Sequence, residues 1–516
     1  AKFSPTLLGD AHRHPAPPRH DGARRPHPPL HGSFFGLPGL SPGSGETVER
    51  SCIKTAEACQ TNSECGRERQ AWVVNILFLD LFGGYPGDFS ANLFFRGEYR
   101  DLDFGESSER RKQLSAALEK RGHTVTVIAA LPVPDLDERD AHKKEGLFSP
   151  CEHGEAVWLY VRVRQDQNSS SIPYRALLDY NLLLYEYAAD LAKMLGPDVV
   201  ISASAYPFDI YPAKRIAKKA GAKLVRDLHD LLPDRLLAES GLKPSPAFLS
   251  MLRGAARRSC EQPSLVISSI PSADEWIQKF AKPKKFLYLS AAASDTRKKC
   301  SELTASLIEQ IETCKAEGRF TILYSGPVTD GRSLRAYLLA AKDAKENPAF
   351  FLSGDGSYKI ILRRIAKEQD IENFYFLDAV PEADEKALLS ASDCVFFGTK
   401  KGSLSEYGFS AEPVLSRMLA GRPLICATGA PNAPVARTNC GILTEPEDAP
   451  GIVSAVDKMQ TLSASERTSM GAAGRKYVLE RHSYDILAER YAAAIENLDN
   501  PPQPEESPAG PGSTSS

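Results

Sequence analysis

Three residues at the end of an apolar run are the first candidates for chemistry. Arg226, Asp227 and His229 stand together in the stretch VRDLHDLLPD. Residues 222–230 predict a strand that runs into this cluster of charge, and in open α/β sheets ligands bind beyond the carboxyl ends of the strands. His229 could act as a base or bind a phosphate, with the neighbouring charges tuning it as a catalytic group. A structural interpretation is equally open, in which Arg226 pairs with Asp227 and His229 is a solvated loop residue.

Two glycines directly follow the first apolar run of the chain. Gly83 and Gly84 come after residues 73–79, which predict a buried strand. Glycine lets a backbone approach a phosphate, and the helix that follows can turn its N-terminus toward the anion. We therefore take both glycines as candidates for an acceptor-side or phosphate-binding loop. A tight strand-to-helix turn would explain them equally well.

A third segment combines a polar turn, a helix, a strand and a loop in YGFSAEPVLSRMLAGRPLICATGAPN, residues 407–432. Its apolar residues from Val414 to Leu419 recur with helical spacing. Gly421 supplies the left-handed position that commonly ends a helix. Residues 423–427 then predict a short buried strand, followed by a loop that we expect to face a ligand.

Strands alternate with helices twice along the chain, which predicts an α/β protein with two doubly wound, Rossmann-like domains. A dehydrogenase or a periplasmic-type binding protein would alternate in the same way, but neither first strand is followed by GxGxxG and a downstream acid. Both ends of the chain have the Pro-, Gly- and Ser-rich composition of disorder. The predicted parts are a disordered segment over 1–71, an N-terminal domain over 72–283, a C-terminal domain over 284–474, a helix over 475–498 and a disordered tail over 499–516.

The composition argues against several classes of protein. A net charge of -3 over 516 residues gives no sign of nucleic-acid binding or of membrane-surface electrostatics. No run of about 18 apolar residues occurs, so no transmembrane helix is predicted. The ten cysteines include no CxxC pair, which suits a reduced compartment, and no metal site is expected. We expect a cytoplasmic protein, while the basic, acid-poor N-terminal segment leaves organelle targeting open as an alternative.

The segment from Tyr407 resembles the donor-site helix of GT-B glycosyltransferases of retaining family 4. The closest resemblance is to the bacterial N-acetyl-fucosamine-transferase-like branch, which typically reads YG-I-S-P-N-K-L-F-E-Y-M-A-A-G-K-P-V-I there. The motif is degenerate, because Pro413 replaces the family's Lys and Ser416 replaces the carboxylate that holds the nucleotide ribose. The phrases LEKRGHTVTVI, VRDL and GDGSYK also resemble family sequences.

The resemblance implies a GT-B fold with a C-terminal helix that crosses back onto the first domain. It also implies transfer of a hexose or N-acetylamino sugar from a nucleotide-sugar, with retention and without metal, to a glycan or lipid-linked acceptor. The nucleotide-sugar is a co-substrate, no cofactor or nucleic acid is expected, and peripheral membrane contact is an open alternative. The implied donor-binding residues are Gly326, Arg332, Gly354, Lys359, Ser410, Ala411 and Glu412. The implied catalytic residues are Arg226, Asp227 and His229, with Gly83 and Gly84 on the acceptor side.

Two other functions fit the same fold. The changes at Pro413 and Ser416 favour a catalytically degenerate GT-B protein that binds a nucleotide or a protein partner. A nucleotide-sugar 2-epimerase would also share the fold, but the family-4 phrases count against it.

Overall fold

The structure is a computed structural model that describes residues 73–82, 105–133, 136, 148–153, 156–164, 173–239, 244–295, 300–345, 348–498 and 501. All of them belong to one compact unit, Glu68–Ser516. The predicted disordered segments over 1–71 and 499–516, apart from Pro501, lie outside the described residues, as do Gly83 and Gly84. None of the helices in the described ranges has the length and apolar character that a membrane span requires.

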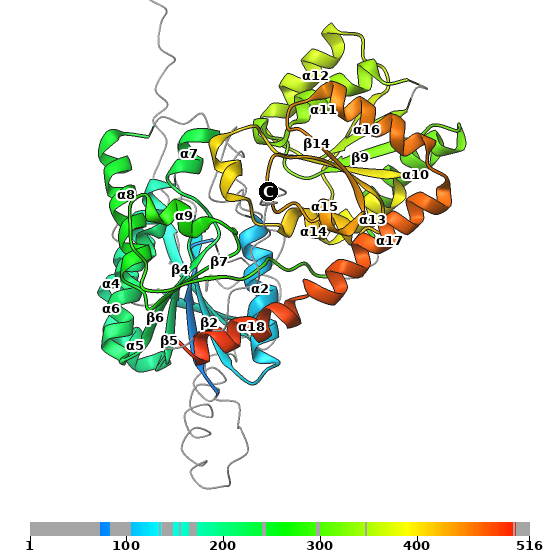
Figure 1. The fold of residues 1–516 in the computed structure, drawn as a ribbon. Helices are drawn as coiled ribbons and strands as arrows, with labels where there is room; N and C mark the ends of the chain where they lie inside the picture. The colour runs from blue at the N-terminus through cyan, green and yellow to red at the C-terminus, as the bar shows by residue number, and fades with distance from the viewer. Residues whose placement is uncertain are drawn as a thin grey trace, which may run out of the picture. The chain divides into compact units, whose positions relative to one another are not determined.

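The first domain is built on an eight-stranded sheet with the order β3-β4-β2-β1-β5-β6-β7-β8 (Figure 1). Neighbouring strands are parallel, except that β3 forms an antiparallel edge with β4. The sequence analysis did not predict β3 or β4. The strands are β1 (Asn75–Leu79), β2 (Thr124–Val133), β3 (Phe148–His153), β4 (Ala156–Arg164), β5 (Val199–Ser202), β6 (Lys223–Leu228), β7 (Leu265–Ser268) and β8 (Phe286–Tyr288).

The second domain is built on a six-stranded parallel sheet with the order β11-β10-β9-β12-β13-β14. Its strands are β9 (Thr321–Ser325), β10 (Ala349–Ser353), β11 (Phe374–Leu377), β12 (Cys394–Gly398), β13 (Leu424–Ala427) and β14 (Gly441–Thr444). In both sheets the strand order reverses at the first strand of the domain, at β1 and at β9. The prediction of two doubly wound domains is confirmed, and each has a switch point where ligands bind in such sheets.

Helices cover both faces of each sheet, and β1 shows why its sequence is continuously apolar. Ile76 and Phe78 pack in the core on one face, whereas Leu77 and Leu79 pack in the core on the other. A central parallel strand is buried on both faces of its sheet. The side chains on either face therefore contact the core and are apolar.

The helices of the first domain are α2 (Gly105–Glu119), α4 (Tyr174–Glu186), α5 (Ala188–Leu195), α6 (Ile210–Ala220), α7 (Asp234–Glu239), α8 (Pro246–Glu261) and α9 (Ala273–Gln278). Those of the second domain are α10 (Glu302–Ala316), α11 (Leu334–Asp343), α12 (Tyr358–Glu368), α13 (Glu382–Ala391), α14 (Glu412–Met418), α15 (Val435–Thr438) and α16 (Ala449–Thr461). Two more, α17 (Ala464–Arg481) and α18 (Tyr484–Glu496), end the described chain.

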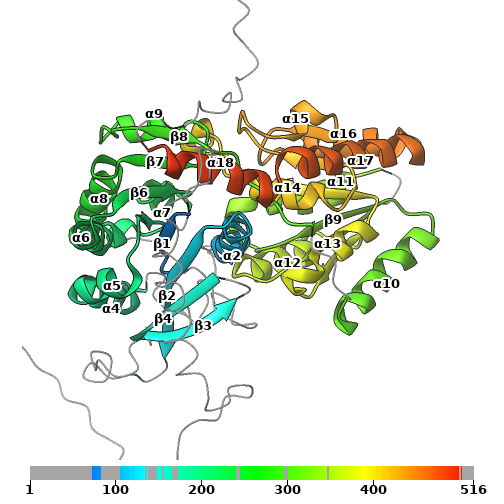
Figure 2. The same ribbon diagram turned by 90° about the horizontal axis from the view of Figure 1, so that it is seen from below.

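The chain returns to the first domain through α17 and α18. Leu487, Tyr491 and Ile495 of α18 lie in the core that contains Phe78, and α18 packs along α2 (Figure 2). We predicted one helix over 475–498, whereas the structure has two. The helices are separate because Ser483 begins α18 as its N-cap, with its hydroxyl accepting from the Ile486 amide.

The boundary between the domains also differs from the prediction. The first sheet was expected to end before residue 283, but β8 extends it to Tyr288. The linker after it is held by side chains of α13 and α17 and by the break between α17 and α18. Asp295 accepts hydrogen bonds from Lys386 and Arg475, and Ala293 donates its amide to the carbonyl of His482 at 2.9 Å. The break between α17 and α18 is thereby tied to the linker.

The His482 ring lies in this junction and predicts a pH dependence of stability. Its Nδ1 lies 3.0 Å from both the carbonyl oxygen of Ala291 and the hydroxyl oxygen of Ser290, and a proton on Nδ1 forms the hydrogen bond to the carbonyl. Burial lowers the pKa of His482, and the charges of Arg490 and Arg481 lower it further against the opposing effect of that hydrogen bond.

Because the folded-state pKa lies below the value of about 6.5 for an unfolded chain, the unfolded state takes up the proton first as the pH falls. We expect His482 to reduce the free energy of unfolding between pH 6.5 and its lower folded-state pKa, by up to about 1.4 kcal/mol per pH unit. His482→Asn should keep the hydrogen bond and remove this contribution. Urea unfolding from pH 7.5 to pH 5 measures it, and parallel curves for the two proteins would contradict the prediction.

Candidate functional site

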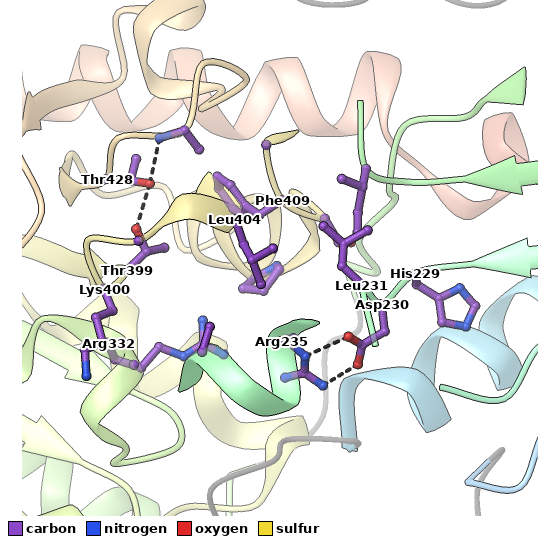
Figure 3. A pocket seen from close by; sticks show the side chains of 18 of the residues that line it. His229, Asp230, Leu231, Arg235, Arg332, Thr399, Lys400, Leu404, Phe409 and Thr428 are labelled. Carbon is purple, nitrogen blue, oxygen red and sulfur yellow. Dashed lines mark hydrogen bonds and ion pairs between the residues drawn. The ribbon is translucent and has the colours of Figure 1, made fainter. Parts of the chain in front are cut away.

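The loops at the carboxyl ends of both sheets enclose a cavity of about 290 Å³ (Figure 3). The first domain lines it with residues that follow β5, β6 and β7, and with Arg110 of α2. The second domain lines it with residues that follow β9, β12 and β13, and with the start of α14. This is the position that the doubly wound topology predicts for a ligand.

Cations outnumber acids in the cavity wall. The charged lining residues are the cations Arg110, Arg235, Arg332, Lys400 and Lys401 and the acids Asp230 and Glu412. Part of this charge is paired, since Arg235 Nε donates to Asp230 Oδ1 at 2.7 Å and Lys400 forms an ion pair with Asp330. With five cations and two acids among its lining residues, the wall is positive overall, which suits an anionic ligand.

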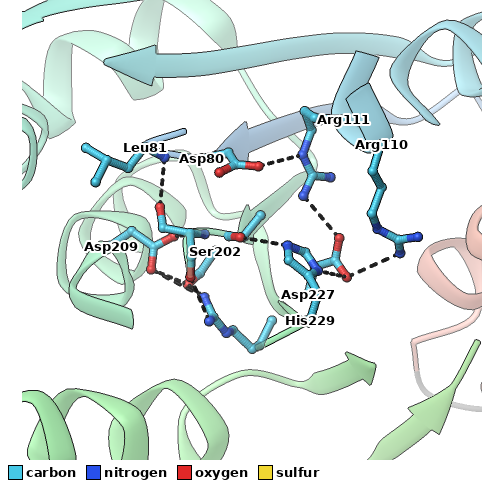
Figure 4. Close-up of polar contacts among 11 residues, drawn as sticks. Asp80, Leu81, Arg110, Arg111, Ser202, Asp209, Asp227 and His229 are labelled. Carbon is cyan, nitrogen blue, oxygen red and sulfur yellow. Dashed lines mark hydrogen bonds and ion pairs between the residues drawn. The ribbon is translucent and has the colours of Figure 1, made fainter. Parts of the chain in front are cut away.

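Asp227 does not line the cavity but lies buried behind it (Figure 4). Arg111 of α2 donates from Nη2 to Asp227 at 3.2 Å and from Nε to Asp80 at 3.0 Å. All three side chains are fully buried. The Arg111 guanidinium also lies 4.2 Å from the ring centroid of Phe78. One arginine therefore joins the carboxyl end of β1 to β6.

His229 does line the cavity, and both of its ring nitrogens face acceptors. Nε2 lies 3.0 Å from the carbonyl oxygen of Ala203, so Nε2 carries a proton, and Nδ1 lies 3.3 Å from Asp227 Oδ1. Burial raises the pKa of Asp227, but the charge and hydrogen bond of His229, with Arg110 and Arg111, bring that pKa well below its usual range. For His229 to act as a base, one of these two contacts would have to break.

Arg226 points away from Asp227, as successive residues of a strand must. Its Nη1 donates to Ser202 at 2.9 Å and its Nη2 donates to the carbonyl of Ser204 at 2.8 Å. Asp209 completes this buried group, accepting from the Ser202 hydroxyl at 2.7 Å. Arg226 and Asp227 thus do not pair with each other, and neither lines the cavity.

The candidate glycines of the second domain join two loops. A Cβ added to Gly354 would lie 1.9 Å from the carbonyl oxygen of Gly326, and the Gly326 amide donates to Ser353 at 3.1 Å. Lys359 is buried beside them, donating to the carbonyls of Gly354 and Leu377 at 2.8 and 2.7 Å. None of the three candidates, Gly326, Gly354 and Lys359, lines the cavity.

The predicted turn before α14 is divided between cavity and core. Ser410 and Glu412 line the cavity, whereas Ala411 packs in the core of the second domain. Tyr484 of α18 donates its hydroxyl to Glu412 Oε1 at 2.7 Å. Burial raises the pKa of Glu412 above its usual value, against the opposing effects of Arg110 and Tyr484. This residue links the cavity to the returning helix.

Sequence reasoning missed several charged residues of the site. Lys400 and Lys401 lie two and three residues beyond the end of β12, so the rule that selected the end of β6 would also have found them. Arg110 is 2% exposed, and none of its three side-chain nitrogens has a hydrogen-bond partner among the described residues. Its Nη2 lies 3.9 Å from Asp227 Oδ1. No pattern in the sequence distinguishes it from a surface arginine.

Arg417 was also missed, although it follows the altered position Ser416. The buried guanidinium donates to the carbonyls of Pro413 and Ser325 and lies 3.5 Å from Glu385. It fills the space beneath Gly326, since a Cβ there would lie 2.7 Å from Arg417 Nη2. Within the described part of the chain, no group of three or more His, Cys, Asp and Glu side chains is placed to hold a metal ion.

The contacts of Arg111 predict a large effect on stability. We expect Arg111→Met to lower the free energy of unfolding by about 3–5 kcal/mol, because it leaves two buried carboxylates without their shared cation. Urea unfolding measures this. The matched control is Arg257→Met, which removes an exposed ion pair with Glu261 and should change stability by less than about 1 kcal/mol. Equal stability of the two variants would contradict the prediction.

Comparison with known proteins agrees with this architecture. Residues 105–277, from α2 to α9, match the family model described as a glycosyl transferase 4-like domain. No protein with a curated description matches the sequence.

Three of the solved structures with a similar fold match this chain over almost their full length. Sucrose-phosphate synthase from Thermosynechococcus elongatus is 14% identical with a TM-score of 0.58, covering 82% of this chain and 98% of its own. Anabaena HepE in complex with UDP and glucose is 15% identical with a TM-score of 0.52, covering 82% and 99%. WaaG, a glycosyltransferase involved in lipopolysaccharide biosynthesis, is 16% identical with a TM-score of 0.53, covering 82% and 100%. The chain therefore has the GT-B fold, and its first domain contains the match to a glycosyl transferase 4-like domain.

Proposed function

We propose that the protein is a glycosyltransferase that moves a sugar from a nucleotide-sugar to an acceptor. The observation that carries this proposal is the cavity at the carboxyl ends of both sheets, with its surplus of cations. A nucleotide-sugar brings a diphosphate, which becomes the leaving group and gains charge as the sugar departs. Fixed cations near that group stabilise the transition state more than the ground state.

The second domain offers the donor site. Arg332 and Lys400 line the cavity from the loops after β9 and β12, and we assign them to the diphosphate. Gly326, Gly354 and Lys359 would then act indirectly, by fixing the loops that carry the site. We assign Ser410 and Glu412 to the transferred sugar, a hexose or an N-acetylamino sugar.

The first domain offers the acceptor side. His229 lines the cavity with its position fixed by Asp227 and Ala203, which suits a group that orients a substrate. We propose a glycan or a lipid-linked molecule as the acceptor. We also propose that the sugar is transferred with retention of configuration. We propose independence from metal because the arginine and lysine side chains supply the positive charge that a metal would otherwise supply.

The similar structures support a nucleotide-sugar as the ligand. HepE is described in complex with UDP and glucose, and its fold matches this chain over most of both lengths. A uridine nucleotide is therefore the first donor to test.

Nucleotide binding tests this proposal. Thermal shift with UDP, GDP and their sugars should show one base that stabilises the protein, by about 2.7 kcal/mol at 100 times its dissociation constant. We expect Arg332→Gln to weaken that binding roughly ten- to a hundred-fold, as the loss of one charge-assisted hydrogen bond predicts. Lys476→Gln, an exposed cation on α17, is the control. Absence of any shift in the unaltered protein would overturn the proposal.

A second candidate is a GT-B protein that binds without catalysis. It is favoured by Ser416, which replaces a carboxylate and does not line the cavity, and by Pro413, which lines it where the resemblance places a lysine. This candidate predicts that the protein binds a nucleotide but releases no product from any nucleotide-sugar.

A double variant, Pro413→Lys with Ser416→Glu, separates the two candidates. If the donor site has decayed, we expect the restored charges to strengthen nucleotide binding about ten-fold, because a lysine at position 413 lines the cavity and can form a charge-assisted hydrogen bond. Calorimetric titration with UDP measures this. Pro246→Lys, at the start of α8 and outside the cavity, is the matched control. Turnover by the unaltered protein would exclude the non-catalytic candidate.

A further inference from the structure

Helix α4 carries an apolar stripe on its exposed side. Tyr174, Leu178, Leu182 and Tyr185 follow one another at spacings of four, four and three residues, which places them along one face. They are 39%, 52%, 48% and 44% exposed, respectively. The opposite side of α4 packs in the core of the first domain. A continuous exposed apolar row of this kind is typical of an interaction site.

Basic residues surround this stripe on the neighbouring helices. Figures 1 and 2 place α4, α5, α6 and α8 side by side at one edge of the first domain, and these helices contact one another. The exposed basic residues of α5, α6 and α8 are Lys193, Lys214, Arg215, Lys218, Lys219, Arg253, Arg257 and Arg258. The exposed acids on the four helices are Glu186 and Asp190. This set of four helices is called the basic helical face below.

Aromatic rings connect the apolar and basic parts of the face. The guanidinium of Arg215 lies 4.3 Å from the ring centroid of Tyr185, and that of Arg258 lies 5.9 Å from that of Tyr211. Two further apolar side chains, Met194 and Met251, are 54% and 58% exposed on α5 and α8. Apolar and cationic groups are thus mixed over one surface.

We propose that the basic helical face docks on an anionic membrane surface. Leucine, methionine and tyrosine side chains would enter the headgroup region, and the lysines and arginines would contact lipid phosphates, as surface-bound amphipathic helices do. The mixture itself selects this partner. A second copy of the same face would meet like charge. A nucleic acid would pair with the cations but offers nothing to bury Leu178 and Leu182.

This proposal stands independently of sugar transfer, because it concerns a surface outside the cavity. If the proposed function also holds, docking would give the protein access to a lipid-linked acceptor. The net charge of -3 conceals the face, since a whole-chain sum says nothing about where the cations lie.

Vesicle co-sedimentation of the full chain tests the proposal. We expect binding to vesicles that mix phosphatidylglycerol with phosphatidylcholine, weaker binding at high salt, and little binding to phosphatidylcholine alone. Lys214→Gln with Lys218→Gln and Lys219→Gln should lower the partition coefficient on the order of a hundred-fold, since each cation near the surface contributes roughly five-fold. Leu178→Gln with Leu182→Gln should lower it about ten-fold or more.

The control is one triple variant on α12 of the second domain, a helix that also presents exposed aliphatic and basic residues. Ile360→Gln with Arg364→Gln and Lys367→Gln should leave vesicle binding unchanged. Every substituted side chain is exposed, and an unchanged melting temperature confirms that each variant folds. The proposal is overturned if the unaltered protein does not bind anionic vesicles, if the α12 variant loses binding instead, or if the leucine variant binds as well as the unaltered protein. Binding of poly(U) RNA without binding of vesicles would identify a nucleic-acid surface and would also overturn it.

Discussion

The buried carboxylate of Asp227 constrains much of the structure around the cavity. It has no access to water, so it stays charged only because Arg111, Arg110 and His229 surround it. Two of these partners are neighbours on α2, and the third directly follows β6. Arg111 fixes α2 against the ends of β1 and β6, and His229 places the first residue beyond β6 at the cavity wall. A charge that must be compensated in the interior therefore determines where the first domain presents its polar groups.

The second domain depends on the same region through α14 and α18. Glu412 lies at the cavity and accepts from Tyr484, which begins the helix that returns to the first domain. Within the linker, Asp295 forms ion pairs with both Lys386 and Arg475. The two domains are thus connected both by the linker and by the returning helix. Polar contacts hold each of these two connections in place. Changes in the cavity near Glu412 have a direct structural route to α18.

Much of the fold follows from sequence pattern, because buried parallel strands are apolar throughout and are separated by helices. The prediction of two doubly wound domains rested on such runs, as at residues 73–79, and the structure confirms it. The pattern failed where local sequence carries little information. The break at His482 depends on a serine cap, and the short strand β8 is recognisable only by its pairing with β7. For the site, the rule about strand ends found His229 and the family resemblance indicated Arg332. Neither indicated Arg110, whose burial depends on tertiary packing alone.

The contact between the loops after β9 and β10 has a consequence for how this protein could change. Backbone meets backbone at Gly326 and Gly354, and a Cβ at Gly356 would lie 2.2 Å from the carbonyl oxygen of Val328. No side chain can be introduced at Gly354 or Gly356 without separating the loops, and a side chain at Gly326 would displace Arg417. Variation between related proteins should therefore spare this part of the second domain and concentrate in the loops after β12 and β6, where lining side chains are free to differ. A new ligand preference would evolve there, on a scaffold that the glycines keep constant.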